Sequence, residues 1–98
     1  MRPVVISRRA RSDLREIADF IAADNPNRAV SFVAELRGRC LSLARHPMQG
    51  RPAPDIAPDA RILVFRAYLI LHRVHDDPVL IDRVIHAARD RAPPWPHE

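Results

Sequence analysis

The spacing of apolar residues changes near the middle of this chain, and that change narrows the possible folds more than any other feature. Before residue 47 the apolar residues recur at helical spacing, whereas after residue 60 they gather into three short β-rich runs. The runs extend from Arg61 to Arg66, from Tyr68 to His75 and from Val79 to Ala87. Because few residues separate the runs, we expect an antiparallel meander, with Asp76-Asp77-Pro78 in its second turn.

The first half predicts a short strand followed by two helices. Pro3 to Ile6 is rich in β-branched residues, and Ser7 can cap a helix from about Arg8 to Ala23. Asn25 and Pro26 suit the start of a second helix, which continues to about Arg45. The expected apolar stripes are Ala10, Leu14, Ile17, Ala18 and Ile21, widened by Phe20, and then Ala29, Val33, Leu36, Cys40 and Leu43. The two stripes can pack together as an antiparallel helical hairpin.

The expected fold class is α+β, with a short N-terminal strand, an antiparallel helical hairpin and a three-stranded antiparallel meander in the order β-α-α-β-β-β. A chain of 98 residues can bury one core, so we assign residues 1–92 to a single domain. Residues 93–98 form a Pro-rich C-terminal tail, in which Trp95 is expected to dock on the domain. Met48 to Asp59 is a Pro-rich connector that we expect to be a loop.

Arginine alone carries the positive charge of this chain. The net charge is +4 at pH 7, and none of the 16 basic residues is lysine. Guanidinium groups bind phosphate and carboxylate through paired hydrogen bonds, so this composition favours an acidic partner, either nucleic acid or an acidic protein segment. Cys40 is the only cysteine, and its place in a helical pattern predicts a small buried side chain. Without the apolar core of a signal peptide or the length of a membrane span, a cytoplasmic protein with no membrane partner is expected.

Both faces of the second meander strand begin with apolar residues. Tyr68 and Ile70 point to one side of the sheet, whereas Leu69 and Leu71 point to the other. A single helical hairpin covers only one face, so the second face needs another cover. That cover is either the connector and tail of this chain or a second subunit or binding partner, and the pattern leaves both open.

Histidines and arginines of the meander are the candidates for chemistry. His72 and His75 lie three residues apart on one strand and face opposite sides, so we expect no metal site. With two glycines the chain has no glycine-rich phosphate loop, and we expect no cofactor. His86 could act as a general base while arginines stabilise a phosphorane-like charge, as RNA cleavage requires. The structural alternative is that His86 is a hydrogen-bonded strand residue.

Four segments, in their order and spacing, resemble the RelE/ParE toxin superfamily and its ParE branch in particular. They are SRRARSDLREIADFIAADNP at Ser7 to Pro26, LARHPMQGR at Leu43 to Arg51, YLILHRV at Tyr68 to Val74 and VIHAARD at Val84 to Asp90. The likeness departs at Arg66-Ala67, where the family pattern often has a glycine. It implies a growth-inhibiting toxin of a type II toxin-antitoxin system, associated with plasmid or chromosome maintenance. A co-expressed antitoxin silences such a toxin in a hetero-oligomeric complex, and operator DNA is bound only indirectly, through the antitoxin.

The resemblance implies one of two targets. ParE-like toxins inhibit DNA gyrase, whereas RelE-like toxins cut messenger RNA on the ribosome with basic residues and frequently an aromatic residue near the C-terminus. Here the chain has no lysine, and its only tyrosine, Tyr68, lies within the meander, with Trp95 near the C-terminus as a poor substitute. This departure favours gyrase and inhibition by binding rather than catalysis. We assign target binding to Arg61, Arg66, Arg73, Arg83 and Arg89. We assign antitoxin binding to Leu14, Ile17, Ile21, Tyr68, Ile70 and Leu71.

Two alternative functions stay open at this point. The first is a ribosome-dependent endonuclease of the RelE type, in which His86 is the catalytic base and Arg83 and Arg89 stabilise charge. The second is a protein-interaction module without toxicity, suggested by the apolar residues on both faces of the sheet.

Overall fold

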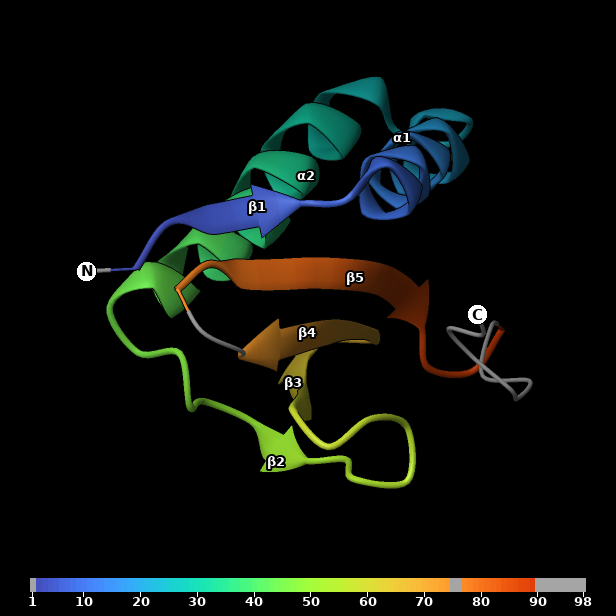
Figure 1. The fold of residues 1–98 in the computed structure, drawn as a ribbon. Helices are drawn as coiled ribbons and strands as arrows, with labels where there is room; N and C mark the ends of the chain where they lie inside the picture. Colours follow the sequence, from blue (N-terminus) through green and yellow to red (C-terminus); the bar gives the residue numbers. More distant parts are fainter. Residues whose placement is uncertain (1, 75–76, 90–98) are drawn as a thin grey trace.

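Both long helices lie in the first half of the chain, and the described strands other than the N-terminal one lie in the second (Figure 1). The computed structural model describes residues 2–74 and 77–89. Its elements are β1 (Val4–Ile6), α1 (Arg8–Ala22), α2 (Pro26–Leu41), the 3-10 helix η1 (Ser42–Ala44), β2 (Arg51–Pro52), β3 (Ala60–Phe65), β4 (Tyr68–Val74) and β5 (Val79–His86). This order confirms the predicted α+β class and adds one short strand, β2, to it.

Side chains at the helix starts confirm both predicted caps. The Ser7 hydroxyl accepts a hydrogen bond from the backbone N–H of Ala10 at 3.0 Å. The side-chain oxygen of Asn25 accepts one from the backbone N–H of Arg28 at 3.1 Å, and Pro26 occupies the first position of α2. These oxygens serve backbone donors that the first turn of a helix leaves without partners, so both helices begin where the sequence predicts.

The described strands form one mixed sheet in the order β1-β5-β4-β3-β2. The antiparallel pairing of β3 with β4 and of β4 with β5 confirms the predicted meander. β1 lies parallel to β5, with Val4 opposite Val79 and Ile6 opposite Ile81, so the sheet joins segments from both ends of the chain. The sequence predicted the strand at β1 but not its pairing, because its partner residues in β5 lie far along the chain. β2 was not predicted, because a strand of two residues is too short to show a periodic pattern.

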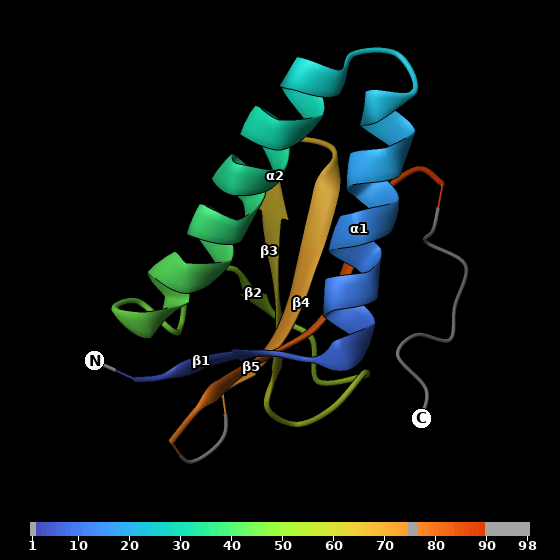
Figure 2. The same cartoon turned by 90° about the horizontal axis from the view of Figure 1, so that it is seen from above.

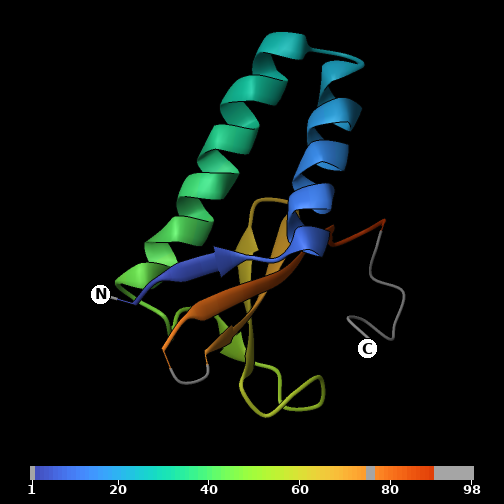
Figure 3. The ribbon, with the colours of Figure 1, turned by 45° about the horizontal axis from the view of Figure 1, so that its top comes forward.

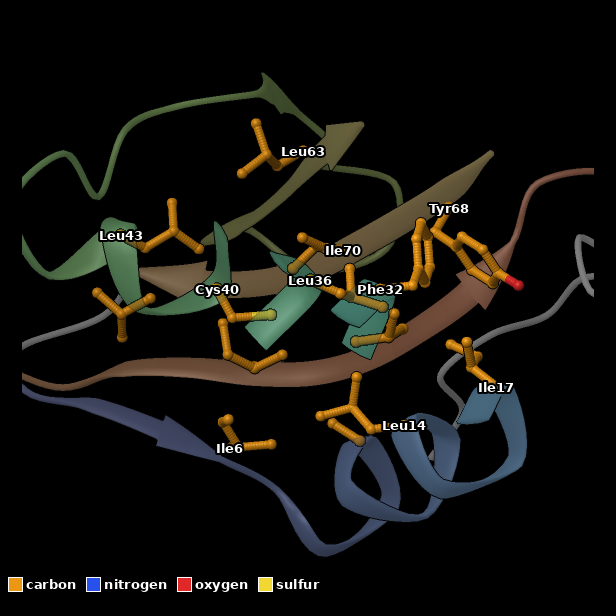
Figure 4. Packing of buried hydrophobic residues seen from close by; sticks show 14 residues of the cluster. Ile6, Leu14, Ile17, Phe32, Leu36, Cys40, Leu43, Leu63, Tyr68 and Ile70 are labelled. Carbon is orange, nitrogen blue, oxygen red and sulfur yellow. The ribbon is translucent and has the colours of Figure 1, made fainter. Parts of the chain in front are cut away.

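The helical hairpin covers one face of the sheet (Figure 2 and Figure 3). The core lies between these two layers, and Figure 4 shows its side chains converging from the helices and strands. Leu36 and Cys40 of α2 and Ile70 of β4 are fully buried there, and Phe32 packs on Tyr68 with ring centroids 5.5 Å apart. Cys40 is therefore the buried core residue that the sequence predicts.

The connector between η1 and β3 covers much of the opposite face. Ala53 of the connector is buried with Ile62 and Leu71 in a second apolar cluster, against which Ile56 packs. Gly50 makes this approach possible, because it has a φ of 84° and a Cβ there would collide with the carbonyl of Ile62. The sequence left open whether the second face is covered by this chain or by a partner. In the structure the chain's own connector lies on that face.

Three local predictions are wrong. The second helix was expected to reach Arg45, but α2 ends at Leu41 and the chain tightens into η1 ahead of Pro47, before which a helix is disfavoured. Phe20 was expected to widen the buried face, but 60% of it is exposed. Arg66 was expected on a strand, but it lies in the β3–β4 turn with a φ of 54°, the conformation that a family glycine would adopt freely.

Several predictions fall outside the described residues. They concern His75, Asp76, Asp90, and the tail at residues 93–98 with Trp95, and they stay predictions. Within the described ranges, the helices are too short or too polar to cross a bilayer.

Leu36 tests the packing of the hairpin on the sheet. Its side chain has no exposed surface, so Leu36→Ala should lower the free energy of unfolding by roughly 2–5 kcal/mol through lost burial and a residual cavity. The measurement is equilibrium denaturation with urea. Val30→Ala on the same helix is the matched control, because Val30 is 75% exposed and its loss should change stability by less than about 0.5 kcal/mol. Equal effects of the two changes would contradict the described core.

Candidate interaction site at the edge of the sheet

Two different partners close the outer edge of β5. β1 pairs with β5 only as far as Ile81, whose carbonyl also accepts the backbone N–H of Ser7 at 3.0 Å. The Ser7 hydroxyl donates to the carbonyl of Asp82 at 3.0 Å. Past this point α1 runs beside β5, and the Asp13 carboxylate accepts the backbone N–H of Val84 at 2.9 Å. Asp13 thus provides the acceptor that a neighbouring strand would otherwise provide.

The Asp13 carboxylate also forms a two-pronged ion pair with Arg83. Nε of Arg83 donates to Oδ2 at 2.9 Å, and an Nη donates to Oδ1 at 3.1 Å. The two side chains are only 5% and 17% exposed. Arg9, whose Nε lies 3.7 Å from the same carboxylate, is largely in solvent. Because the partly buried charges are matched and hydrogen-bonded, this pair can anchor α1 to the sheet edge without leaving an isolated charge.

Asp13 was not among the residues predicted from the sequence. A signal for it existed, because Asp13 lies at helical spacing with Ala10 and Ile17 and next to Leu14, on the buried stripe of α1. An acidic residue on such a stripe must be paired or hydrogen-bonded to be stable. The sequence does not say which partner it has, because Arg83 lies 70 residues away.

A pocket of about 540 Å³ opens beside this ion pair. Its walls are formed by Arg9, Asp13, Glu16, Ile17, Phe20, Arg83, Val84 and Arg89. The guanidinium of Arg89 lies over the ring of Phe20, 4.1 Å from its centroid, and donates weakly to the Tyr68 hydroxyl at 3.5 Å. We call this hollow the edge pocket. It combines exposed cations with one exposed aromatic ring, the chemistry of a protein-binding surface.

His86 holds the turn that follows β5. Its Nδ1 accepts the backbone N–H groups of Ala88 and Arg89, each at 3.1 Å. Its ring packs edge-on against Tyr68, with centroids 5.1 Å apart. Nδ1 can accept these bonds only without a proton, so this nitrogen is already occupied in positioning Arg89. The structural alternative for His86 therefore matches its observed contacts.

The five arginines assigned to target binding do not share one surface. Arg83 and Arg89 line the edge pocket, whereas Arg66 lies in the β3–β4 turn, 3.7 Å from Glu35. The remaining two, Arg61 and Arg73, lie at the opposite end of the β3–β4 hairpin, roughly 17 Å away along the strands.

The two arginines at that distant end already have partners. Nε of Arg73 donates to Asp59 at 3.0 Å. Arg61 donates to the backbone carbonyls of Gln49 and Gly50 at 3.4 and 2.8 Å, which fastens the connector to the sheet. Their contacts are those of residues that stabilise the fold.

The residues assigned to antitoxin binding lie mostly in the core. Leu14, Ile17, Tyr68, Ile70 and Leu71 are all buried, and only Ile21 of the set is partly exposed. The alternation of apolar residues in β4 is explained by the hairpin on one face and the connector on the other. Ile17 and Leu14 each still contribute to the wall of a pocket, whereas a partner could reach Tyr68, Ile70 and Leu71 only if the fold rearranged. Phe20, which the sequence placed inside, is the apolar side chain that the edge pocket offers.

Groups suited to metal binding or nucleophilic chemistry are dispersed in the described part of the chain. No three His, Cys, Asp or Glu side chains there lie close enough to hold a metal ion. Burial raises the pKa of the Cys40 thiol to about 11, so it is an unreactive core group. Burial also lowers the pKa of His72, and the carbonyl of Ile70 partly opposes this effect. Among the described residues Nε2 of His72 has no hydrogen-bond partner.

Comparison with known proteins gives the same fold and one family. The family model described as "ParE toxin of type II toxin-antitoxin system, parDE" matches residues 4–91. A solved structure described as "Chromosomal ParDE TA system from P. aeruginosa" superposes with a TM-score of 0.77 at 24% identity, covering 88% of this chain and 96% of that chain. At that identity the likeness establishes the fold alone. The search of curated proteins gave no match.

Asp13→Asn tests the anchor at the sheet edge. The change keeps the size of the side chain but removes its charge and presents an amide donor to Arg83 or Val84. We expect the free energy of unfolding to fall by roughly 2–4 kcal/mol, because Arg83 is left partly buried without a carboxylate. Glu16→Gln, at an exposed acid of the same helix, is the control and should change stability little. The anchor would be disproved if both variants unfolded at the same urea concentration.

Proposed function

Because the chain belongs to the ParE toxin family of type II toxin-antitoxin systems, we propose that it inhibits DNA gyrase by binding and that a cognate antitoxin neutralises it. The observation that carries this proposal beyond the family is the edge pocket, where Arg89 stacks on the exposed ring of Phe20. Arginine and aromatic side chains in a concave site are typical centres of binding energy at protein interfaces. Within this proposal the target surface is narrowed to the edge pocket, where Arg89 is an exposed cation and Arg83 is a wall residue held by Asp13.

The contacts of His86 and Arg83 support inhibition without catalysis. A ribonuclease needs a base that can take up a proton and a cation that can meet the developing phosphorane charge. Nδ1 of His86 instead accepts two backbone N–H groups, and the guanidinium of Arg83 is paired with Asp13. The endonuclease alternative would require both contacts to be broken first, so it has the weaker support.

The antitoxin is proposed to occupy the same edge pocket. An acidic segment with an apolar residue would match the cations at Arg9 and Arg89 and the exposed ring of Phe20. Neutralisation would then follow from competition, because antitoxin and target could not contact Arg89 together. In this proposal the antitoxin, and not this chain, reads the operator sequence, so operator DNA is reached through the partner.

Purified gyrase decides between the two targets. The chain should block supercoiling and leave translation intact. His86→Gln should retain most of the inhibition, because no proton transfer is needed and the glutamine side-chain oxygen can still accept a backbone N–H of the turn that positions Arg89. Arg89→Glu should weaken inhibition about tenfold or more through loss of a central contact. Arg51→Glu, an exposed charge reversal on β2, is the control. Messenger RNA cleaved in the ribosomal A site, with supercoiling unaffected, would replace gyrase inhibition by the endonuclease alternative.

Phe20→Ala tests the shared pocket. Because the side chain is 60% exposed, thermal stability should stay near that of the wild type, while antitoxin affinity should fall about tenfold or more. Isothermal titration calorimetry with the antitoxin encoded beside this chain gives the affinity, and Val30→Ala, an exposed apolar residue of α2, is the control. Unchanged affinity, or gyrase inhibition that persists at saturating antitoxin, would reject the shared pocket.

A further inference from the structure

A row of arginines lies on a second side of α1, away from the edge pocket. Arg8, Arg11 and Arg15 are separated by three and four residues, so they project from one side of the helix over roughly 10 Å of its axis. All three are exposed. At 100° per residue this row is rotated by more than 90° from Phe20 and Asp13, which face the edge pocket. The two surfaces can therefore be occupied at the same time.

A fourth arginine extends the row across the helical hairpin. Exposed Arg37 of α2 joins Arg11 and Arg15 around a shallow groove between the two helices. The groove has a volume of about 210 Å³, and its other walls are Leu14, Ala18 and Val33. We call Arg8, Arg11, Arg15 and Arg37 the hairpin arginines.

No acidic side chain within the described residues forms an ion pair with a hairpin arginine. Three nearby acids have other positions: Asp13 faces β5, Glu16 lines the edge pocket, and Glu35 is paired with Arg28. Exposed Asp19, four residues after Arg15, lies on the same side of α1 as the row but forms no ion pair with it among the described residues. The positive end of the α1 helix dipole lies beside Arg8 and adds to the same potential. Asp19 therefore offsets only one of the four positive charges on this side of the described fold, whereas Arg73 and Arg83 are each paired directly with a carboxylate.

We propose that the hairpin arginines bind the phosphate backbone of duplex DNA, independently of its sequence. Along α1 the cations recur about every 5–6 Å, and a DNA strand presents one phosphate per roughly 3.4 Å of helix axis, so each guanidinium can meet its own phosphate. Guanidinium groups match phosphate oxygens through paired hydrogen bonds. Guanidinium groups bind phosphate oxygens whatever the base sequence, so we assign this contact to positioning the protein on the duplex and not to reading its sequence.

Duplex DNA fits this side better than an acidic protein segment does. An amphipathic segment needs space for its apolar side chains, but the groove is smaller than the roughly 300–1,000 Å³ of typical ligand pockets. Leu14 at its base is almost fully buried and offers little apolar surface. Three hairpin arginines line this shallow groove and Arg8 extends the row, and none of the four has an ion-pair partner among the described residues, which instead suits a rigid polyanion. The inference goes beyond the proposed function and would hold whether or not gyrase is the target.

Salt dependence of DNA binding tests the inference. Fluorescence anisotropy with the full chain and a labelled 20-base-pair duplex of arbitrary sequence measures the affinity at several salt concentrations. With four phosphate contacts, affinity should fall roughly 150-fold between 50 and 200 mM salt, because its logarithm falls by about 0.9 per contact per decade of salt. The double change Arg11→Gln and Arg15→Gln removes two contacts, so the fall should shrink to roughly 12-fold.

Two comparisons make the result specific to the hairpin arginines. Arg51→Gln with Arg66→Gln changes the net charge equally at exposed positions elsewhere and should keep the wild-type salt dependence. Thermal melting verifies that both double variants fold. Equal salt dependence in all three proteins, or no binding at 50 mM salt, would overturn the proposal. Tighter binding to polyglutamate than to the duplex, lost in the Arg11 and Arg15 variant, would overturn it in favour of an acidic protein segment.

Discussion

The position of α1 depends on how the outer edge of β5 is satisfied. β1 covers this edge only to Ile81, and a buried strand edge with unpaired amides would be unstable. Asp13 solves the problem by accepting the N–H of Val84 while its charge is matched by Arg83. The helix must therefore lie along β5 with one fixed rotation about its axis. That rotation points Phe20 toward the edge pocket, turns the hairpin arginines away from it, and sets where α2 packs.

Local signals in the sequence were sufficient for most of the fold. Ser7 and Asn25 indicated where the helices begin, because a capping side chain bonds to the backbone within one helical turn. The meander was predicted from short β-rich runs that few residues separate. The pairing of β1 with β5 and the role of Asp13 were missed because each depends on residues about 70 or more positions away. Spacing alone also misplaced Phe20, since apolar character does not reveal which side of a helix a partner will cover.

The site was harder to predict than the fold because one residue type serves two purposes. Arg73 and Arg83 are matched with carboxylates and hold segments together, whereas Arg11 and Arg15 are exposed and form no ion pair in the described structure. Composition treats all of them as positive charge. The positions of the acidic residues in the fold distinguish arginines that form ion pairs within the protein from arginines that are free to bind a partner. His86 is a similar case, because the sequence alone allowed a catalytic base. In the structure its ring accepts two backbone N–H groups of the turn after β5, which are the contacts of a positioning residue.

The parallel pairing of β1 with β5 also means that the sheet cannot form in full until the C-terminal strand has been synthesised. The ribosome synthesises the chain from its N-terminus, so Val4 and Asp13 emerge long before their partners. Val4 pairs with Val79, and Asp13 accepts the N–H of Val84. The helical hairpin can form early from local contacts, but the edge pocket contains Arg83 and Arg89 and cannot exist in a shorter nascent chain. Chains interrupted before β5 therefore lack both the anchor of α1 and the edge pocket.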